Sequence, residues 1–292
     1  SVAKGRWWRL LLASRPVSWI NTALPFAGGA LAAGAGEAVG AWFLPLLIWW
    51  GVAYNVVLYG INDLYDLDTD RKNPRKGGAE GALLQDGDLP TLRRLLAFTA
   101  ATAPIFVLTG SVTVPIACLV GIALAVAYSA PWFLRARAVP ILDAVISATH
   151  FVVPAVAGLA LGGAFQQAWI APLAAFFFWN MGSHVVGALQ DVDADRESRI
   201  ATVGTLLGVR GGGWLAIGLY AVAGLLLVLQ DEPLQRIGAL LPLASILSLL
   251  PLIAGRPTHR AARAAWRRFM LLNLFLGAGA AILIIRSLVG AA

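Results

Sequence analysis

The sequence predicts an all-α polytopic membrane protein with nine transmembrane helices, and two observations predict this fold class. The first is composition, because 59% of the residues are hydrophobic, 13% are charged and the mean hydropathy is +0.76. A transmembrane helix needs ~20 predominantly apolar residues, and runs of this length that are nearly free of charge recur along the chain. The apolar core of a soluble protein would explain one such run, but not nine. The expected spans are 17–35, 41–61, 92–110, 113–130, 139–161, 168–190, 213–230, 235–254 and 269–289.

Lysine and arginine provide the second observation. If nine spans follow a cytoplasmic N-terminus, 20 of the 22 basic residues fall in segments on the cytoplasmic side, and only Arg236 and Arg286 fall elsewhere. An excess of basic residues on this side is typical of membrane proteins. We therefore expect a multi-pass protein of the cell membrane with a cytoplasmic N-terminus and an extracytoplasmic C-terminus. The net charge of +7 then reflects topology and the anionic cytoplasmic leaflet, and it does not indicate nucleic-acid binding.

The two long segments between spans, 62–91 and 191–212, both lie on the expected cytoplasmic side. Most of the acidic residues lie in them, since 11 of 15 fall within 63–88 and 191–197. The two acidic clusters follow spans two and six, which are four helices apart, and this spacing indicates a duplicated four-helix unit with half of a metal site in each copy. We expect residues 1–292 to form a single integral-membrane domain with a cytoplasmic active site.

The first acidic cluster is expected to lie on one face of a helix. Asp63, Asp66 and Asp70 are spaced three and four residues apart, and Asn62 precedes Asp66 by four. Residues at these separations share a helical face, whereas Asp68 points roughly the other way. The alternative is a solvated helix end that carries acidic residues. It is disfavoured because carboxylates at a helix C-terminus oppose the helix dipole.

The second cluster repeats this pattern, with Asp191 and Asp195 four residues apart and Asp193 on the opposite face. Two such helices facing each other would surround one volume with five carboxylates and one amide. Mg²⁺ takes oxygen ligands and keeps waters and substrate phosphates in its shell. The arrangement therefore suits two or three Mg²⁺ ions that bridge the protein to a diphosphate. Cys118 is the only cysteine, so disulfides and thiolate metal sites are excluded.

Basic residues follow the first cluster at once. Arg75 and Lys76 lie in a segment that Pro74 and two glycines predict to be a loop, and such a loop can close over phosphates. We expect both side chains to contact the diphosphate. The alternative is that both side chains only contribute to the excess of positive charge that is typical of cytoplasmic segments and do not contact the diphosphate.

Polar residues inside the spans are expected to line a cavity, because intramembrane polar groups are costly and usually face the interior of a bundle. Hydrogen bonds between helices are an alternative that the pattern leaves open. His150, in the middle of a span, is interpreted as a core histidine. The expected cavity residues are Arg15, Asn21, Asn55, Tyr59, Asn180 and His184.

The paired motifs Asn62-Asp63-x-x-Asp66-x-x-x-Asp70 and Asp191-x-x-x-Asp195, in a chain of nine membrane helices, resemble those of the UbiA superfamily of intramembrane prenyltransferases. The resemblance covers essentially the whole chain. It implies a bundle of nine helices around a central cavity that opens laterally to lipid. It also implies a cytoplasmic cap, formed by the loops after spans two and six, and Mg²⁺-dependent transfer of a prenyl group from a prenyl diphosphate to a lipophilic acceptor.

Within this superfamily, the sequence is most similar to the lycopene elongase branch, which makes long-chain carotenoids. The similarity lies in Asn73-Pro74-Arg75-Lys76-Gly77-Gly78 with Glu80-Gly81, and in Tyr128-Ser129-Ala130-Pro131. It implies dimethylallyl diphosphate as the donor and a lycopene-type carotenoid as the acceptor.

One departure concerns the residues that contact the diphosphate after span four. Many relatives carry a Tyr-x-x-x-Lys arrangement there, whereas Tyr128 of this chain is followed by Trp132. Tyr128 is expected to contact the diphosphate, and Arg135 or Arg137 to supply the positive charge instead of the lysine.

The expected reaction begins with ionisation, in which Mg²⁺ held by the five aspartates neutralises the departing diphosphate. An apolar cavity then keeps the allylic cation from water while a terminal double bond of the acceptor attacks it. Loss of a proton or addition of water ends the reaction. Alternative acceptors are an aromatic or quinone precursor, a tetrapyrrole and a glycerol-phosphate lipid. A carboxylated aromatic would require a basic group in the cavity, and none is evident within the spans.

A more distant alternative is a cation or phosphate transporter that uses the acidic clusters as a permeation site. A transporter would be expected to carry carboxylates near the middle of the bilayer, whereas both clusters are expected at the cytoplasmic ends of their spans.

Overall fold

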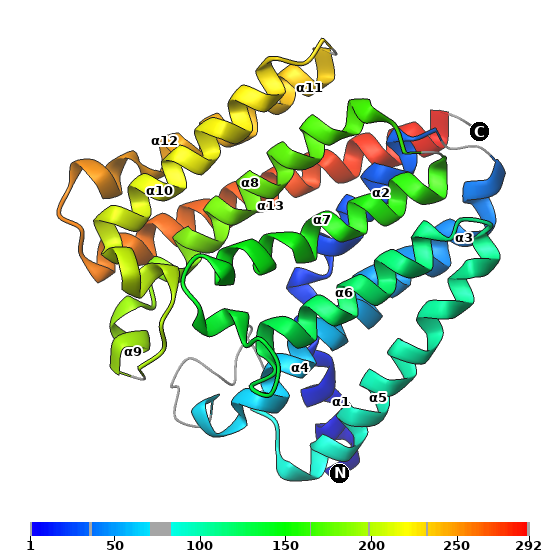
Figure 1. Cartoon of the computed structure of the whole chain (residues 1–292), viewed down its shortest axis with the longest axis horizontal. Helices are drawn as coiled ribbons and strands as arrows, with labels where there is room; N and C mark the ends of the chain where they lie inside the picture. The colour runs from blue at the N-terminus through cyan, green and yellow to red at the C-terminus, as the bar shows by residue number, and fades with distance from the viewer. Residues whose placement is uncertain are drawn as a thin grey trace. The chain divides into compact units, whose positions relative to one another are not determined.

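The computed structural model describes residues 2–34, 37–70, 83–163, 165–197, 199–231 and 233–290, and these ranges are helical without any strand (Figure 1). The prediction of an all-α chain is confirmed. The chain divides into two compact units, Ser1–Arg135 with Val153–Ala164, and Ala136–Val152 with Phe165–Ala292. Each unit carries one acidic cluster, as the spacing of the clusters predicts. The assignment of the whole chain to one functional domain stays a prediction.

In the first unit, α4 packs along α5 and α6, and α2 packs against α3 (Figure 1). Its core is aromatic, with Trp50, Tyr54 and Phe26 fully buried. The helices of this unit are α1 (Val2–Ala13), α2 (Ile20–Ala32), α3 (Glu37–Ile48), α4 (Tyr54–Asp70), α5 (Leu89–Thr102), α6 (Thr113–Ser129) and the C-terminal part of α7 (Leu142–Gly162).

A π-helical turn, Trp49–Ala53, joins α3 to α4 inside the second predicted span. Such turns leave backbone carbonyls without regular helical partners, and polar side chains can satisfy them. Asn55 donates from Nδ2 to the Gly51 carbonyl at 2.8 Å and to Thr22 Oγ1 at 2.7 Å. Thr22 in turn donates to the Trp50 carbonyl at 2.7 Å. These bonds tie α4 to α2 within the apolar core.

An ion pair fixes α1 to the turn that begins α5. Arg9 donates from Nε and Nη2 to the two carboxylate oxygens of Asp88 at 2.7 and 2.8 Å, and Asp88 also accepts from the Gln85 amide at 2.9 Å. The hydrogen bond that Arg9 donates to Asp88 raises the pKa of the Arg9 guanidinium. This bidentate geometry holds α1 in place ahead of Arg15, which follows it in the chain.

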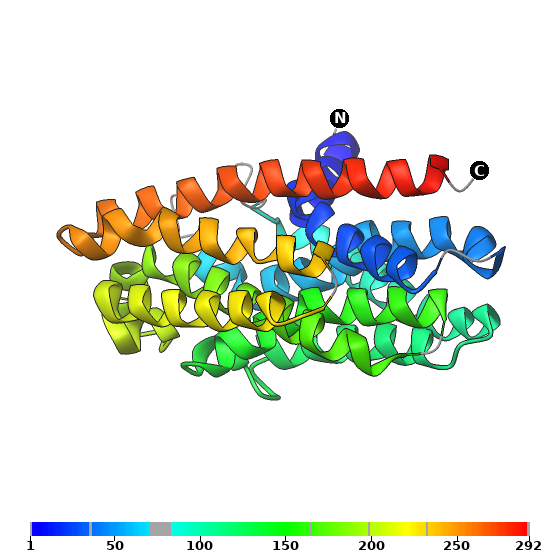
Figure 2. The same ribbon diagram turned by 90° about the horizontal axis from the view of Figure 1, so that it is seen from above.

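In the second unit, α10 packs against α8 and α12, and α13 lies beside α12 and α8 (Figure 2). Polar pairs join these helices: Ser183 and Tyr220 lie 3.2 Å apart, and Trp179 donates to Ser245 at 3.0 Å. Hydrogen bonds of this kind are a common means of association between membrane helices. The helices of this unit are the N-terminal part of α7, α8 (Ile170–Leu189), α9 (Val192–Glu197), α10 (Val203–Val228), α11 (Pro233–Gly238), α12 (Leu240–Ala254) and α13 (His259–Gly290).

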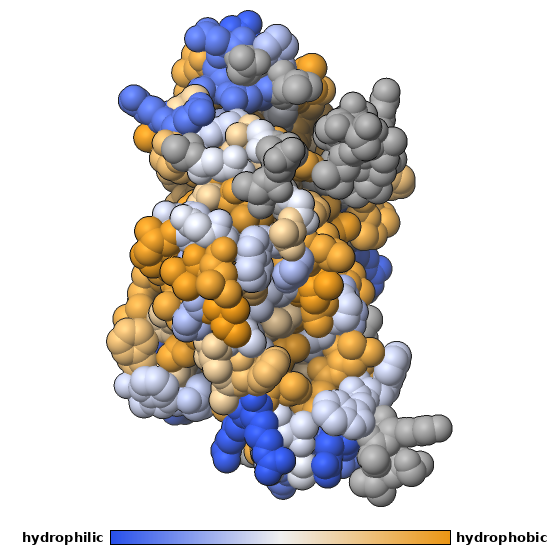
Figure 3. Space-filling view, turned by 90° about the vertical axis from the view of Figure 1, so that its right-hand side faces the viewer, coloured by the Kyte–Doolittle hydropathy of each residue, from blue (hydrophilic) through white to orange (hydrophobic). Residues whose placement is uncertain are grey.

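Each of the nine predicted spans contains a helix, and apolar residues cover much of the surface seen in Figure 3. Within the described part of the chain, six helical runs are long and apolar enough to cross a membrane, and α6 is apolar but shorter. A multi-pass membrane protein is therefore supported, and the count of nine stays a prediction. The six runs are Gly40–Leu67, Asp86–Thr109, Leu142–Gly162, Gln167–Leu189, Val203–Val228 and Gln235–Ala254.

Candidate active site

The first half-site lies on the C-terminal part of α4, which continues as a helix to Asp70. Asp63 and Asp66 are one turn apart and almost fully buried, with 1% and 5% of their surfaces exposed. Asn62 accepts a hydrogen bond from Ser129 Oγ at 3.4 Å, which links this face of α4 to the end of α6. The helical register predicted for the cluster therefore holds from Asn62 to Asp66. The side chain of Asp70, and the whole of Arg75 and Lys76, lie outside the described residues.

Arg15 lies beside this half-site, at the break between α1 and α2. Its backbone is left-handed, with φ 49°, which is uncommon for a residue with a side chain. The guanidinium lies 4.2 Å from the centre of the Tyr59 ring, and Nη2 lies 3.7 Å from Asp63 Oδ1. Tyr59 and Asp63 are one turn apart on α4, so the two contacts hold a cation next to a buried carboxylate. Sequence analysis predicted Arg15 and Tyr59 as cavity residues, and the structure brings both to Asp63.

The second half-site differs from the prediction in one respect. The sequence indicated that the acidic cluster continues the helix of span six, but α8 ends at Leu189 and the cluster begins a separate helix, α9. The Asp195 amide donates to the Asp191 carbonyl at 2.8 Å, so these residues still lie one turn apart. The physical reason is that aspartate is favoured at the start of a helix, where the dipole stabilises it, and not at the end.

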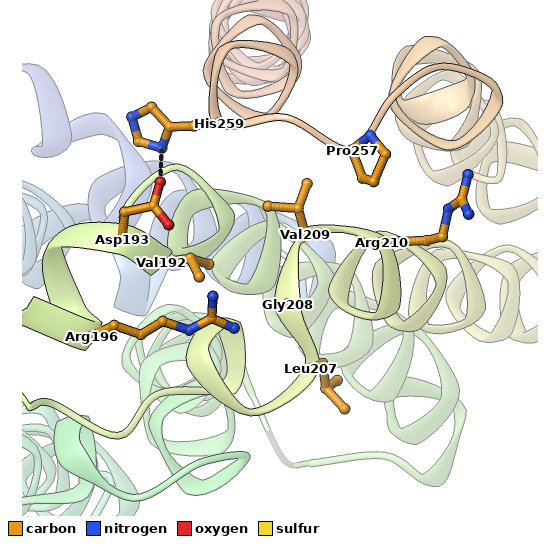
Figure 4. A pocket seen from close by; sticks show the side chains of 9 residues that line it. All are labelled: Val192, Asp193, Arg196, Leu207, Gly208, Val209, Arg210, Pro257 and His259. Carbon is orange, nitrogen blue, oxygen red and sulfur yellow. Dashed lines mark ion pairs between the residues drawn. The ribbon is translucent and has the colours of Figure 1, made fainter.

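Asp193 lies on the other side of α9, as its spacing predicts. It is exposed and its Oδ2 is 3.8 Å from His259 Nδ1 (Figure 4). Arg196 and Gly208 line the same pocket, whose volume is about 380 Å³. Asp191 and Asp195 do not line this pocket.

A hydrogen-bonded network that sequence analysis missed supports Asp195. Thr202 donates from Oγ1 to Asp195 Oδ2 at 3.2 Å, and the next amide, that of Val203, donates to Asp143 Oδ2 at 2.9 Å. His184 Nε2 lies 3.5 Å from the same oxygen of Asp143. The network connects the start of α7, the C-terminal part of α8, α9 and the start of α10. One signal was present in the sequence, since Asp143 is the only acidic residue between Asp88 and Asp191.

The remaining cavity predictions have different local environments. Asn55 is fully buried, and its hydrogen bonds to Thr22 and Gly51 are the helix-to-helix contacts that the sequence left open as an alternative. Asn180 donates to the Phe176 carbonyl in its own helix at 2.8 Å. Asn21 is partly buried. Whether these side chains line a cavity stays a prediction.

Around the end of α6, Tyr128 is partly buried, Arg135 is exposed with a left-handed backbone, and Arg137 is partly buried. Their contact with a diphosphate stays a prediction. Trp132, which follows Tyr128 where many relatives carry lysine, donates from its indole nitrogen to Tyr65 Oη at 2.6 Å. This bond connects the loop after α6 to the residue that precedes Asp66.

The donor atoms of both half-sites fit a magnesium ion chemically. They are carboxylate and amide oxygens, which Mg²⁺ prefers over nitrogen and sulfur. Asp63 and Asp66 also place two buried carboxyl groups one turn apart, and a bound divalent cation would favour the ionised form of both. Among the described residues, no three side chains of His, Cys, Asp or Glu form a complete metal-binding cluster. The metal-ligand assignments therefore stay predictions.

Comparison with known proteins decides the family. Residues 22–276 match the profile of the UbiA prenyltransferase family. The chain belongs to this family. This UbiA family member is therefore a prenyltransferase, as the sequence predicted, and the transporter alternative is set aside.

Curated relatives of this UbiA prenyltransferase agree with the predicted branch. The chain is 39% identical to the lycopene elongase/hydratase of Corynebacterium glutamicum, over 94% of this chain and 96% of that protein. It is 38% identical to a C(50) beta-cyclic carotenoids biosynthesis protein of Dietzia sp., over 92% of this chain and 62% of that protein. It is 32% identical to the lycopene elongase/hydratase of Haloferax volcanii, over 86% of this chain and 81% of that protein.

Solved structures share the fold. A UbiA homolog from Archaeoglobus fulgidus bound to DMAPP and Mg²⁺ aligns with a TM-score of 0.61 at 20% identity, over 90% of this chain and 99% of that one. A structure of digeranylgeranylglyceryl phosphate synthase aligns with a TM-score of 0.71 at 14% identity, over 97% of this chain and 99% of that one. At these identities the likeness establishes the UbiA fold and does not identify a substrate.

Proposed function

We propose that this enzyme transfers a dimethylallyl group from dimethylallyl diphosphate to a lycopene-type carotenoid in the presence of Mg²⁺. The observation that carries the acceptor is the 39% identity, over nearly the full length of both chains, to a lycopene elongase/hydratase. The donor is supported by the two oxygen-rich half-sites and by the DMAPP and Mg²⁺ bound to a protein of the same fold.

In the proposed mechanism, five aspartates hold the metal ions of the diphosphate, and Asn62 adds an amide oxygen. Mg²⁺, when bound, neutralises the charge that develops on the leaving diphosphate. The remaining diphosphate contacts are proposed for Arg75, Lys76 and Tyr128, with Arg135 or Arg137. The five aspartates are Asp63, Asp66, Asp70, Asp191 and Asp195.

The bond between C1 of the donor and its oxygen breaks, and the electron pair leaves with the diphosphate. The apolar side chains of the helices exclude water from the allylic cation. The π electrons of the terminal double bond of the acceptor then form the new bond to C1 and leave a cation on the acceptor. Loss of a proton gives a double bond, and addition of water with loss of a proton gives an alcohol.

Expression in a lycopene-producing host tests the acceptor. We expect carotenoids heavier by one or two five-carbon units, with or without added water, and mass spectrometry of the extracted pigments measures them. The matched control is the Asp66→Asn variant, which should leave lycopene unchanged. Unchanged lycopene beside a prenylated hydroxybenzoate, naphthoate, chlorophyllide or glycerol-phosphate lipid would move the assignment to an alternative acceptor.

We also propose that residues 1–292 form one catalytic domain with nine spans in the cell membrane, and that the loops after spans two and six form a cytoplasmic cap. The support is the bias of lysine and arginine toward one side.

Reporter fusions test this topology. A reporter placed at Gly87 is expected to be active on the cytoplasmic side, and a reporter after Ala292 on the opposite side. Alkaline phosphatase and green fluorescent protein fusions at both positions measure the two sides. If both positions report the same side, the number of spans is even and the charge argument is wrong.

A further inference from the structure

His184, which is partly buried, and Asp143, which is buried, form a pair in the second unit outside both acidic clusters. We propose that His184, oriented by Asp143, is the base that removes the proton at the end of the reaction. The proposal rests on the proposed prenyl transfer, and it adds the group that accepts the proton when the acceptor cation is converted to product.

Asp143 is 1% exposed, and each of its carboxylate oxygens accepts a hydrogen bond from a backbone amide. Its Oδ1 accepts from the Ala144 amide at 2.8 Å, and its Oδ2 accepts from the Val203 amide at 2.9 Å. These two hydrogen bonds orient the carboxylate, so that it can in turn orient a third group. That group is His184, whose Nε2 lies 3.5 Å from Oδ2. A carboxylate next to Nε2 favours the tautomer with hydrogen on this nitrogen, which leaves the lone pair on Nδ1.

The position of His184 on α8 suits the reacting carbons. It lies five residues before Leu189, where α8 ends, and Asp191 follows in the turn that leads to α9. At a rise of 1.5 Å per residue, His184 is about 8 Å along the axis from the end of α8. His184 also lies inside the apolar run Gln167–Leu189, whereas Asp191 lies beyond it. If Asp191 holds the diphosphate end of the donor, the proposal places His184 on the side of the prenyl and acceptor carbons.

The other two histidines of the chain are placed differently. His150 on α7 is 2% exposed, so the protein covers its ring. His259 begins α13 and pairs with Asp193, which lies on the exposed side of α9. The side chain of His184 retains 19% exposure, so part of its ring remains accessible.

The proposed step is balanced in atoms and electrons. His184 Nδ1 takes a proton from the carbon next to the cationic centre, and the C–H electron pair becomes the new double bond. In hydration, a water oxygen bonds to the cationic carbon while Nδ1 takes one of its protons. The carboxylate of Asp143 stabilises the imidazolium in both cases, as carboxylates do for catalytic histidines generally. One base thus accounts for both endings of the reaction.

The departing diphosphate is the competing base, and the test separates the two. Wild type, His184→Gln, Asp143→Asn and the matched control His259→Gln are assayed in liposomes with Mg²⁺, dimethylallyl diphosphate and lycopene. Diphosphate release, dimethylallyl alcohol and elongated carotenoid are measured together, and melting temperatures confirm folding.

In His184→Gln we expect diphosphate release within about threefold of wild type, while elongated carotenoid falls about a hundredfold, the magnitude typical of a lost general base. Dimethylallyl alcohol should replace the missing product, because water captures the cation. Asp143→Asn should show the same change in product ratio to a smaller degree, and His259→Gln should match wild type. A merely structural role would lower all products together. Imidazole added to His184→Ala should restore elongation.

Two results would overturn the proposal. One is an unchanged yield of elongated carotenoid in His184→Gln, which would assign the proton to the diphosphate. The other is loss of diphosphate release together with product in a folded variant. If wild type leaves lycopene unchanged, the proposed acceptor is wrong, and the same product ratio is then measured on the acceptor that wild type does prenylate.

Discussion

The Asp66→Ala variant is expected to lose prenyl transfer by about a thousandfold or more, because it removes a carboxylate that serves the diphosphate. The carboxylate of Asp66 is expected to serve the diphosphate and not the apolar core, so the variant should remain folded, and its melting temperature measures this. Asp191→Ala is expected to have the same effect on transfer. Initial rates of diphosphate release across a Mg²⁺ titration measure the loss.

The matched control is Asp193→Asn, which changes an exposed carboxylate on the other side of α9. Its effect should be much smaller than that of Asp191→Ala. Asp68→Asn should likewise be mild, because Asp68 is expected off the shared face of α4. Activity in EDTA equal to that in Mg²⁺ would contradict the metal mechanism. An Asp68→Asn variant as inactive as Asp66→Ala would contradict the helical-face argument.

The first half-site could be predicted from sequence because it lies within one helix. The separations of Asn62, Asp63 and Asp66 fix their relative directions once α4 is helical, and nothing else in the fold needs to be known. The family could be predicted for the same reason, since both motifs are local. Arg15 was predicted as a cavity residue, but its contact with Asp63 depends on a left-handed backbone between two helices, and no spacing rule gives that.

The second half-site was predicted less well. No proline or glycine stands between Leu189 and Asp195 to indicate that α8 ends. The preference of aspartate for a helix start favours the break at Asp191, whereas the preceding apolar run contains no signal that α8 ends there. The pair of Asp143 and Val203 could not be predicted at all, because it joins a side chain to a backbone amide 60 positions away.

Alanine at Gly158 is expected to be strongly destabilising, because α2 and the C-terminal part of α7 touch through their backbones within the first unit. A Cβ at Gly158 would overlap the carbonyl oxygen of Phe26 and lie 2.7 Å from the Ala30 nitrogen. On the opposite helix, a Cβ at Gly29 would overlap the carbonyl oxygen of Ala155. Small residues permit this approach between membrane helices, and a methyl group on either side forces the backbones apart.

We expect Gly158→Ala and Gly29→Ala each to cost about 3 kcal/mol or more, the upper range for overpacking, and to lower the melting temperature by about 6 °C or more. Gly28→Ala is the matched control, because a Cβ at this neighbouring position meets nothing within 4 Å. Alanine should be neutral or stabilising there, since it favours a helix interior over glycine. Thermal unfolding in detergent measures all three variants. Equal melting of Gly28→Ala and Gly29→Ala would mean that the backbones are not in contact. Because Arg15 lies just before α2, a shift of this helix should also weaken the ion pair between Arg15 and Asp63. Prenyl-transfer activity should therefore fall in the variants that remain folded.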